Sequence, residues 1–292
     1  MVEGKTITGR LPDFFVLGAA KSGTSALFRY MERHPAISIP EIKETEYYSK
    51  DSLYAKQKDW YLSLYSEVGE GQLCGEASTT YTRWPHTPDV AERIFDDVPE
   101  ARMIYIMRHP VERTYSHFVH HTRTGVTRTF EEALDQDDIY VDCSMYMKQI
   151  ERYLRFYPRE RFLFLFQTDL KKDPQAIMDR VSAHLGIDRE DVMAEGPIAR
   201  NVSGSDHFVR SRTTGKLRKI KPIGWLADTL PERWRSAAFG LVKKSPIGRR
   251  LESGYKVPPL NQDTRKRLLD LFAEPNRQLE EFLGVELPSW SV

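Results

Sequence analysis

The residue pattern best suited to chemistry is the stretch FFVLGAAKSGTS, at positions 14–25. It has the composition of a short apolar strand, a turn of small residues and the start of a helix. Backbone N–H groups in such a turn, together with a helix N-terminus, can bind an anion. Lys21 adds a positive charge, and Thr24 and Ser25 add hydroxyl donors in the first helical turn. We therefore expect a phosphate-binding loop here; the alternative is a structural turn rich in Gly and Ser.

This loop differs from the Walker A pattern of nucleotide triphosphatases. In that pattern Gly-Lys-Ser/Thr follows four spacer residues, whereas here Lys21 precedes Gly23. The strand expected to end at Met107 is followed by Arg108, where a triphosphatase would need a carboxylate for its metal ion. Both differences disfavour a metal-dependent triphosphatase.

A second candidate anion site follows the apolar run at 103–107. Arg108 stands directly after this run, and ligands of open α/β sheets bind at the carboxyl ends of the strands. Ser116 lies two turns into the helix expected next and can add a hydroxyl to the same ligand. Arg108 alone is weak evidence, but together with the loop at 18–25 it is strong evidence for a phosphate-bearing ligand.

Short apolar runs alternate with helical patterns, and runs that are apolar on both faces indicate buried parallel strands. We expect a P-loop-like three-layer α/β fold with a central parallel sheet of about five strands flanked by helices. The expected strands are 14–17, 103–107 and 162–166, with weaker candidates at 36–39 and 72–76. The expected helices are 24–33, 111–122, 144–156, 173–185 and 264–283, the last with a kink at Pro275.

The composition narrows the class of protein. The 292 residues carry 43 Lys or Arg and 42 Asp or Glu, a formal net charge of +1, which argues against a general nucleic-acid binder. The 2 cysteines are too few for a disulfide scaffold and lack metal-ligand spacing, so we expect a reducing compartment and no metal. Residues 1–10 do not resemble a secretory signal, and no run of about 18 residues is apolar enough to span a bilayer. These features predict a soluble cytoplasmic protein.

The chain is expected to form a single domain, 1–292. It would comprise an α/β core at 11–200, a basic irregular segment over the site at 201–260, and a C-terminal helix at 261–292 that packs on the core.

At residues 18–35 and 108–116 the chain resembles the sulfotransferases that use 3′-phosphoadenosine 5′-phosphosulfate (PAPS). The first stretch is similar to that family's 5′-phosphosulfate loop and helix, and the second to its 3′-phosphate motif. The segment KETEYY, residues 43–48, resembles the Lys-Glu-x-x-Phe-Phe segment of the carbohydrate branch, which contains heparan sulfate 3-O- and N-sulfotransferases. Shorter similar stretches occur at 59–61, 75–81 and 155–158. The resemblance runs from about residue 13 to residue 186 and returns weakly near the C-terminus.

The resemblance implies a function for each matching residue. Lys21 would contact the bridging oxygen of the phosphosulfate, and Glu44 would act as the base. Arg108 and Ser116 would bind the 3′-phosphate. The residues that would hold the 5′-phosphate are Ser22, Gly23, Thr24 and Ser25.

Two positions depart from the family's pattern. Ala77 stands where the family has a basic residue after the Glu of its Glu-Lys-Thr/Ser-Pro stretch, and the proline of that stretch is absent. Glu46 stands where some heparan enzymes have a His. Both positions flank the acceptor in the family, which argues against heparan itself as the substrate.

Sulfuryl transfer, like phosphoryl transfer, is an in-line displacement in which charge builds on the leaving oxygen, so positioning and electrostatics dominate catalysis. We expect Lys21 to stabilise that oxygen without a metal, and Glu44 to accept the proton of an acceptor hydroxyl. Glu46 and Glu76 are the competing candidates for the base. The expected reaction moves the sulfuryl group from PAPS to a hydroxyl of a glycan or glycoconjugate and leaves adenosine 3′,5′-bisphosphate. The alternatives are a small-molecule kinase with a variant phosphate loop and a non-catalytic nucleotide-binding module.

The net charge hides a basic segment. Residues 200–250 carry 13 Lys or Arg against three Asp or Glu, a local charge of +10, and the rest of the chain carries −9. In one interpretation the segment closes over the nucleotide, as a late loop does in the family, with Arg210 or Arg212 on the 3′-phosphate. In a second it recruits an acidic acceptor, and in a third the apolar residues within 220–250 contact a membrane surface. We favour the first two.

The spacing of residues does not decide the function of several aromatic and histidine side chains. Tyr47 and Tyr48 are either core aromatics or a wall on which a sugar stacks. The histidines at 117, 120 and 121 suggest metal spacing, but no nearby acid or cysteine set completes a site, so a polar helix surface or acceptor contact is favoured.

Overall fold

The computed structural model describes residues 9–122, 128–198 and 257–291. Contacts divide the chain into two compact units. The first comprises residues 1–114, 137–200 and 265–292, and the second comprises residues 115–136 and 201–264. The first unit contains the whole sheet together with Lys21, Glu44 and Arg108.

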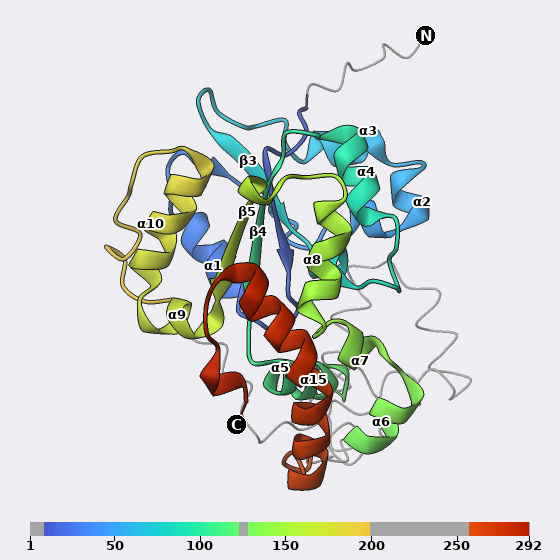
Figure 1. The fold of residues 1–292 in the computed structure, drawn as a ribbon. Helices are drawn as coiled ribbons and strands as arrows, with labels where there is room; N and C mark the ends of the chain where they lie inside the picture. The colour runs from blue at the N-terminus through green and yellow to red at the C-terminus, as the bar shows by residue number, and fades with distance from the viewer. Residues whose placement is uncertain (1–8, 123–127, 199–256, 292) are drawn as a thin grey trace, which may run out of the picture. The chain divides into compact units, whose positions relative to one another are not determined.

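A parallel sheet of five strands forms the centre of the first unit, in the order β2-β3-β1-β4-β5 (Figure 1). The strands are β1 (Phe14–Gly18), β2 (Ile37–Ser38), β3 (Leu73–Ala77), β4 (Arg102–Met107) and β5 (Phe162–Phe166). In β1, Val16 lies opposite Ala77 on one side and Ile104 on the other. Every residue of β1 is buried, which explains why this run is apolar without alternation. The predicted parallel sheet is confirmed, including its two weaker strands.

One face of the sheet is covered by α1 (Thr24–Met31), α9 (Gln167–Lys172) and α10 (Pro174–Leu185) (Figure 1). Phe14 and Val16 of β1 share a hydrophobic core with Leu27 of α1 on this face. Because side chains alternate along a strand, the residues between them belong to the opposite face.

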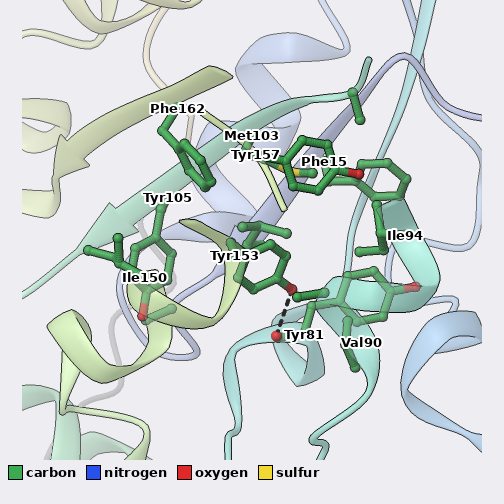
Figure 2. Close-up of a cluster of buried hydrophobic side chains, with 14 of the residues drawn as sticks. Phe15, Tyr81, Val90, Ile94, Met103, Tyr105, Ile150, Tyr153, Tyr157 and Phe162 are labelled. Carbon is green, nitrogen blue, oxygen red and sulfur yellow. Dashed lines mark hydrogen bonds between the residues drawn. The ribbon is translucent and has the colours of Figure 1, made fainter. Parts of the chain in front are cut away.

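The opposite face packs against α4 (Val90–Asp97) and α8 (Tyr146–Leu154) (Figure 1). Figure 2 shows part of this core, where Phe15 of β1 and Tyr105 of β4 lie with Tyr153 of α8. The Tyr153 hydroxyl donates a hydrogen bond to the carbonyl of Tyr81 at 2.8 Å. The short helices of this unit are η1 (Tyr47–Ser49), α2 (Asp51–Tyr54), α3 (Lys58–Ser63), η2 (Thr79–Thr82), α7 (Ile139–Asp142), η3 (Arg159–Arg161) and η4 (Pro288–Trp290).

Tyr47 and Tyr48 belong to this second core. Both side chains are fully buried, and the ring of Tyr47 stacks on that of Tyr61 with centroids 4.0 Å apart. Burial raises the pKa of Tyr47 to about 12. Of the two interpretations left open by the sequence, these are core aromatics and present no face to a sugar.

Helix ends follow the sequence signals. The Asp173 side chain accepts a hydrogen bond from the Ala176 N–H at 3.0 Å and begins α10, and Gly186 closes it in a left-handed conformation. Near the C-terminus, α15 spans Gln262–Leu283 and includes Pro275.

The second unit contains the later part of α5 (Pro110–Thr122) and all of α6 (Phe130–Gln136). In this unit the Thr264 hydroxyl donates to the Glu131 carboxylate at 2.7 Å. Most of the segment expected at 201–260 lies outside the described residues, so its expected position over the site stays a prediction.

Candidate active site

Residues 19–23, between β1 and α1, form the candidate phosphate loop. Lys21 (φ 71°) and Gly23 (φ 98°) have left-handed backbone conformations, and the Ser22 N–H donates to the Ala19 carbonyl at 3.1 Å. Gly23 is also the N-cap residue of α1, where its positive φ favours glycine. The Ala19 N–H bonds to the Ile106 carbonyl at 2.8 Å, which joins the loop to β4.

The N-terminus of α1 is suited to an anion. Gly23 supplies no side-chain cap, and the first helical turn contains no acidic residue. The Ser22 hydroxyl is fully buried, and among the described residues it forms no hydrogen bond. It is close enough to the Tyr146 hydroxyl to oppose the burial-driven rise in the pKa of that phenol, but the pair lacks hydrogen-bond geometry. A buried hydroxyl without a partner costs about 1–3 kcal/mol, which an oxyanion in the loop would offset.

Arg108 brings a second cation to this loop. Its Nη1 donates to the Lys21 carbonyl at 3.5 Å, and the Tyr146 hydroxyl holds its backbone, donating to the carbonyl at 2.6 Å and accepting from the N–H at 3.3 Å. Glu112 lies 3.5 Å from Nη2 and also accepts from Arg265 at 2.7 Å. Burial lowers the pKa of the Arg108 guanidinium, and Glu112 opposes that effect. A positive charge that is partly removed from water beside the loop attracts an anion.

Arg113 also forms a hydrogen bond with the loop. Its side chain is fully buried and donates to the Ala20 carbonyl at 3.5 Å. It also donates to the Ser144 hydroxyl and to the Tyr140 carbonyl, both at 2.5 Å. The loop therefore has guanidinium groups from two positions of the same strand–helix segment, Arg108 and Arg113.

Hydrogen bonds from Thr79 of η2 and from the neighbouring Lys43 hold the Glu44 carboxylate in one orientation. Its Oε2 accepts from the backbone N–H of Thr79 at 2.8 Å and from the Thr79 hydroxyl at 3.0 Å, and its Oε1 accepts from Lys43 at 2.5 Å. The side chain remains 36% exposed, so the carboxylate can still meet a ligand. The ammonium of Lys43 lies 6.0 Å from the ring centroid of Phe28, which places this segment beside α1.

The 3₁₀ helix η2 links Glu44 to the phosphate loop. Thr79 at its start holds the Glu44 carboxylate, and Thr82 at its end donates to the Leu17 carbonyl at 3.1 Å. A Cβ at Gly18 would lie 2.4 Å from the Thr82 hydroxyl, so this contact requires glycine where β1 ends. One short helix thus contacts both Glu44, the candidate proton acceptor, and the end of β1 where the phosphate loop begins.

The two competing acids have different surroundings. Glu46 pairs with Lys50, and its N–H donates to the Ser78 hydroxyl at 3.1 Å. Glu76 is fully buried among hydroxyl groups, and this burial raises its pKa. With no exposed surface, Glu76 cannot reach an acceptor; Glu44 and Glu46 both keep exposed surface.

The remaining predicted binding residues are distributed as follows. Thr24 is buried and Ser25 exposed in the first turn of α1. Ser116 is half-buried on the part of α5 that belongs to the second unit. Arg210 and Arg212 lie outside the described residues, as does the proposed membrane-contacting segment. Within 9–122, 128–198 and 257–291, no cluster of three or more His, Cys, Asp or Glu side chains could hold a metal ion.

Sequence reasoning missed three residues that shape the site: Thr79, Thr82 and Tyr146. Thr79 and Thr82 follow the carboxyl end of β3, a strand adjacent to β1. Ligands of open α/β sheets bind at this end of the strands, so polar residues there were a signal that could have identified both. Tyr146 offered no such signal.

A family model described as the sulfotransferase domain matches residues 11–203. The chain belongs to the sulfotransferase family. The match includes the phosphate loop, Glu44, Arg108 and Ser116, and it makes the protein an enzyme that transfers sulfate.

Curated relatives of this sulfotransferase include enzymes named for heparan sulfate. The human bifunctional heparan sulfate N-deacetylase/N-sulfotransferase 3 is 26% identical over 307 residues, covering 96% of this chain and 31% of the relative. The human heparan sulfate glucosamine 3-O-sulfotransferase 6 is 26% identical over 189 residues, covering 62% of this chain and 54% of the relative. These relatives agree with the resemblance to the heparan sulfate enzymes expected from the sequence, and the chain spans about a third of the length of the N-deacetylase/N-sulfotransferase.

Two further comparisons concern fold and membrane association. The crystal structure of a sulfotransferase from Alicyclobacillus acidocaldarius superposes with a TM-score of 0.67 at 23% identity, covering 97% of this chain and 99% of that one, which shows the P-loop-like fold. The membrane-associated sulfotransferase kil1 of Dictyostelium discoideum is 38% identical over 120 residues, covering 40% of this chain and 24% of the relative. Across the described part of the sulfotransferase, no helix is long and apolar enough to cross a membrane. The cytoplasmic location stays a prediction.

PAPS is the donor that membership of the sulfotransferase family implies, and the residues present fit it. The buried Ser22 hydroxyl lacks a hydrogen-bond partner among the described residues, beside a helix N-terminus with no side-chain cap. Arg108 adds a charge that is partly removed from water. A phosphosulfate group would satisfy the hydroxyl and the helix N-terminus together.

Proposed function

We propose that this sulfotransferase moves the sulfuryl group of PAPS to a hydroxyl of a glycan or glycoconjugate. The observation that carries the proposal is the link through η2, which joins a loop suited to an anion to an oriented carboxylate, Glu44. The heparan sulfate enzymes among the relatives support a glycan acceptor. The departures at Glu46 and Ala77 favour an acceptor other than heparan itself.

The binding residues form two groups, one for the 5′-phosphosulfate of PAPS and one for its 3′-phosphate. Ser22 and the first N–H groups of α1, with Thr24 and Ser25, hold the 5′-phosphosulfate end. Arg108 holds the 3′-phosphate, with Ser116 and with Arg210 or Arg212 as further candidates. When bound, PAPS supplies a sulfuryl group already activated by a phosphate leaving group.

Lys21 and Glu44 perform opposite tasks. The Lys21 ammonium stabilises the charge that builds on the leaving oxygen. The Glu44 carboxylate accepts the proton of the attacking hydroxyl, and its two bonds from Thr79 fix the rotamer in which it does so. Neither task needs a metal ion.

The full chain incubated with sulfur-labelled PAPS and a panel of acceptors tests the proposal. The panel should hold heparan sulfate, its unsulfated precursor, other hydroxyl-bearing glycans and a simple phenol. We expect label transfer to a glycan with or without EDTA. A parallel thermal shift compares adenosine 3′,5′-bisphosphate with ATP and Mg²⁺; stabilisation by ATP alone would show a kinase instead. Binding of adenosine 3′,5′-bisphosphate without transfer to any acceptor would indicate the non-catalytic nucleotide-binding module.

A further inference from the structure

The buried Glu76 carboxylate at the end of β3 accepts hydrogen bonds from three hydroxyl groups. Its Oε1 accepts from Thr45 and from Ser78, both at 2.8 Å. Its Oε2 accepts from Tyr61 at 2.5 Å. The side chain is fully buried and therefore cannot contact an acceptor.

The two hydroxyls that donate to Oε1 belong to residues adjacent in sequence to Glu44, the candidate base, and to Thr79, which bonds to the Glu44 carboxylate. Thr45 follows Glu44, and Ser78 precedes Thr79, whose N–H and hydroxyl hold the Glu44 carboxylate. One oxygen atom of Glu76 thus ties together the two chain segments whose relative position sets the Glu44–Thr79 bonds.

We propose that Glu76 is a positioning residue for sulfuryl transfer, and that it acts on Glu44 through Thr45 and Ser78. The proposal rests on the function proposed above for Glu44. In this proposal Glu76 contributes to catalysis without contacting the substrate.

The two carboxylate oxygens of Glu76 contact different parts of the fold, so the positioning of Glu44 and the stability of the fold can be tested separately. Oε1 leads to the segment that carries Glu44, whereas the Tyr61 hydroxyl on Oε2 belongs to α3 and to the stacked core around Tyr47. Removing a hydroxyl from the Oε1 side should therefore disturb catalysis, and removing the hydroxyl from the Oε2 side should disturb only packing and stability.

A carboxylate suits this arrangement better than an amide or an apolar group. It accepts at both oxygens, so each of the three O–H donors finds an acceptor, whereas the NH₂ of a glutamine could not accept from Tyr61. An apolar residue would leave three buried hydroxyls without this acceptor, which is costly.

Thr45→Val keeps the side-chain shape but removes the hydroxyl that donates to Glu76, accepts from the Tyr47 N–H at 3.3 Å and lies 3.4 Å from the Tyr81 hydroxyl. We expect kcat to fall about tenfold or more, with KM for PAPS and Kd for adenosine 3′,5′-bisphosphate, measured by calorimetry, unchanged. Thr45→Ser restores the hydroxyl and should return kcat to within about twofold of the wild type. The matched control, Tyr61→Phe, should lower the Tm but leave kcat within about twofold. Wild-type kcat in Thr45→Val, or an equal loss of kcat in Tyr61→Phe, would overturn the proposal.

A double-mutant cycle with Glu44→Gln distinguishes this proposal from the proposed function. If Thr45 acts through Glu44, adding Thr45→Val to Glu44→Gln should lower kcat no further. Losses that multiply would refute positioning while leaving Glu44 as the base. Wild-type kcat in Glu44→Gln would instead refute the proposed base, and the positioning proposal with it.

Discussion

The guanidinium of Arg108 donates a hydrogen bond across 3.5 Å to the carbonyl of Lys21, a residue 87 positions away in sequence. The contact joins the two candidate anion sites. It arises because β4 lies beside β1 in a parallel sheet, so the segments that follow both strands meet at one edge. A ligand with two phosphate groups can therefore contact both segments.

Arg108→Ala should weaken binding of adenosine 3′,5′-bisphosphate. Loss of a charge-assisted contact worth about 1.5–3 kcal/mol corresponds to a rise in Kd of about tenfold to a hundredfold. Calorimetry on the full chain measures it. Arg29→Ala, which removes an exposed arginine of α1, is the matched control and should leave Kd unchanged. An unaltered Kd in Arg108→Ala would contradict the assignment.

Ser22→Ala should have opposite effects on the free and the bound protein. Its hydroxyl is buried and has no hydrogen-bond partner among the described residues, so removing it should leave the Tm of the free protein unchanged or raised. The stabilisation given by adenosine 3′,5′-bisphosphate should shrink, because the variant lacks a donor to the ligand. A thermal-shift titration measures both. A lower Tm without ligand would show that the hydroxyl has a structural partner instead.

Glu44→Gln should lower kcat by about a hundredfold to ten-thousandfold, the usual contribution of a positioned base. The amide oxygen can still accept from Thr79, so the fold and the Kd for adenosine 3′,5′-bisphosphate should not change. Glu41→Gln, an exposed acid three residues earlier, is the control and should retain wild-type kcat. If Glu46→Gln and not Glu44→Gln is inactive, the base is Glu46.

Lys21→Ala should lower kcat by about a hundredfold to a thousandfold, since the charge that stabilises the leaving oxygen is lost. Single-turnover kinetics with labelled PAPS separates this effect on chemistry from an effect on donor binding. A loss confined to KM would show that Lys21 only binds the donor.

The sequence predicted the parts of the site that depend on local pattern. The strand, turn and helix around Lys21 and the strand before Arg108 could be recognised because their residues are adjacent in sequence. The Thr79 contact with Glu44 spans 35 positions and the Tyr146 contact with Arg108 spans 38, and such pairs follow from the strand order. For the same reason, burial of Glu76 could not be distinguished from exposure without the fold.

The stability of the protein should depend on pH through Glu76. Burial raises the folded-state pKa of this carboxyl above its usual value of 4.5, although hydroxyl donors, Tyr61 first among them, oppose the rise. The native state therefore binds the proton more tightly than the unfolded state, so Glu76 stabilises most below about pH 4.5, and this contribution is lost as pH rises through the folded pKa. The titratable side chains whose pKa values respond to Glu76 are Tyr48, Tyr61, Tyr65, Tyr81 and Tyr153. Their own pKa values are raised, so they stay neutral in this range.

Glu76→Gln cannot titrate, so the free energy of unfolding of the wild type minus that of the variant should fall with rising pH. Urea unfolding of both proteins from about pH 4 to about pH 8 measures this difference, and a constant value would show that burial does not raise the pKa.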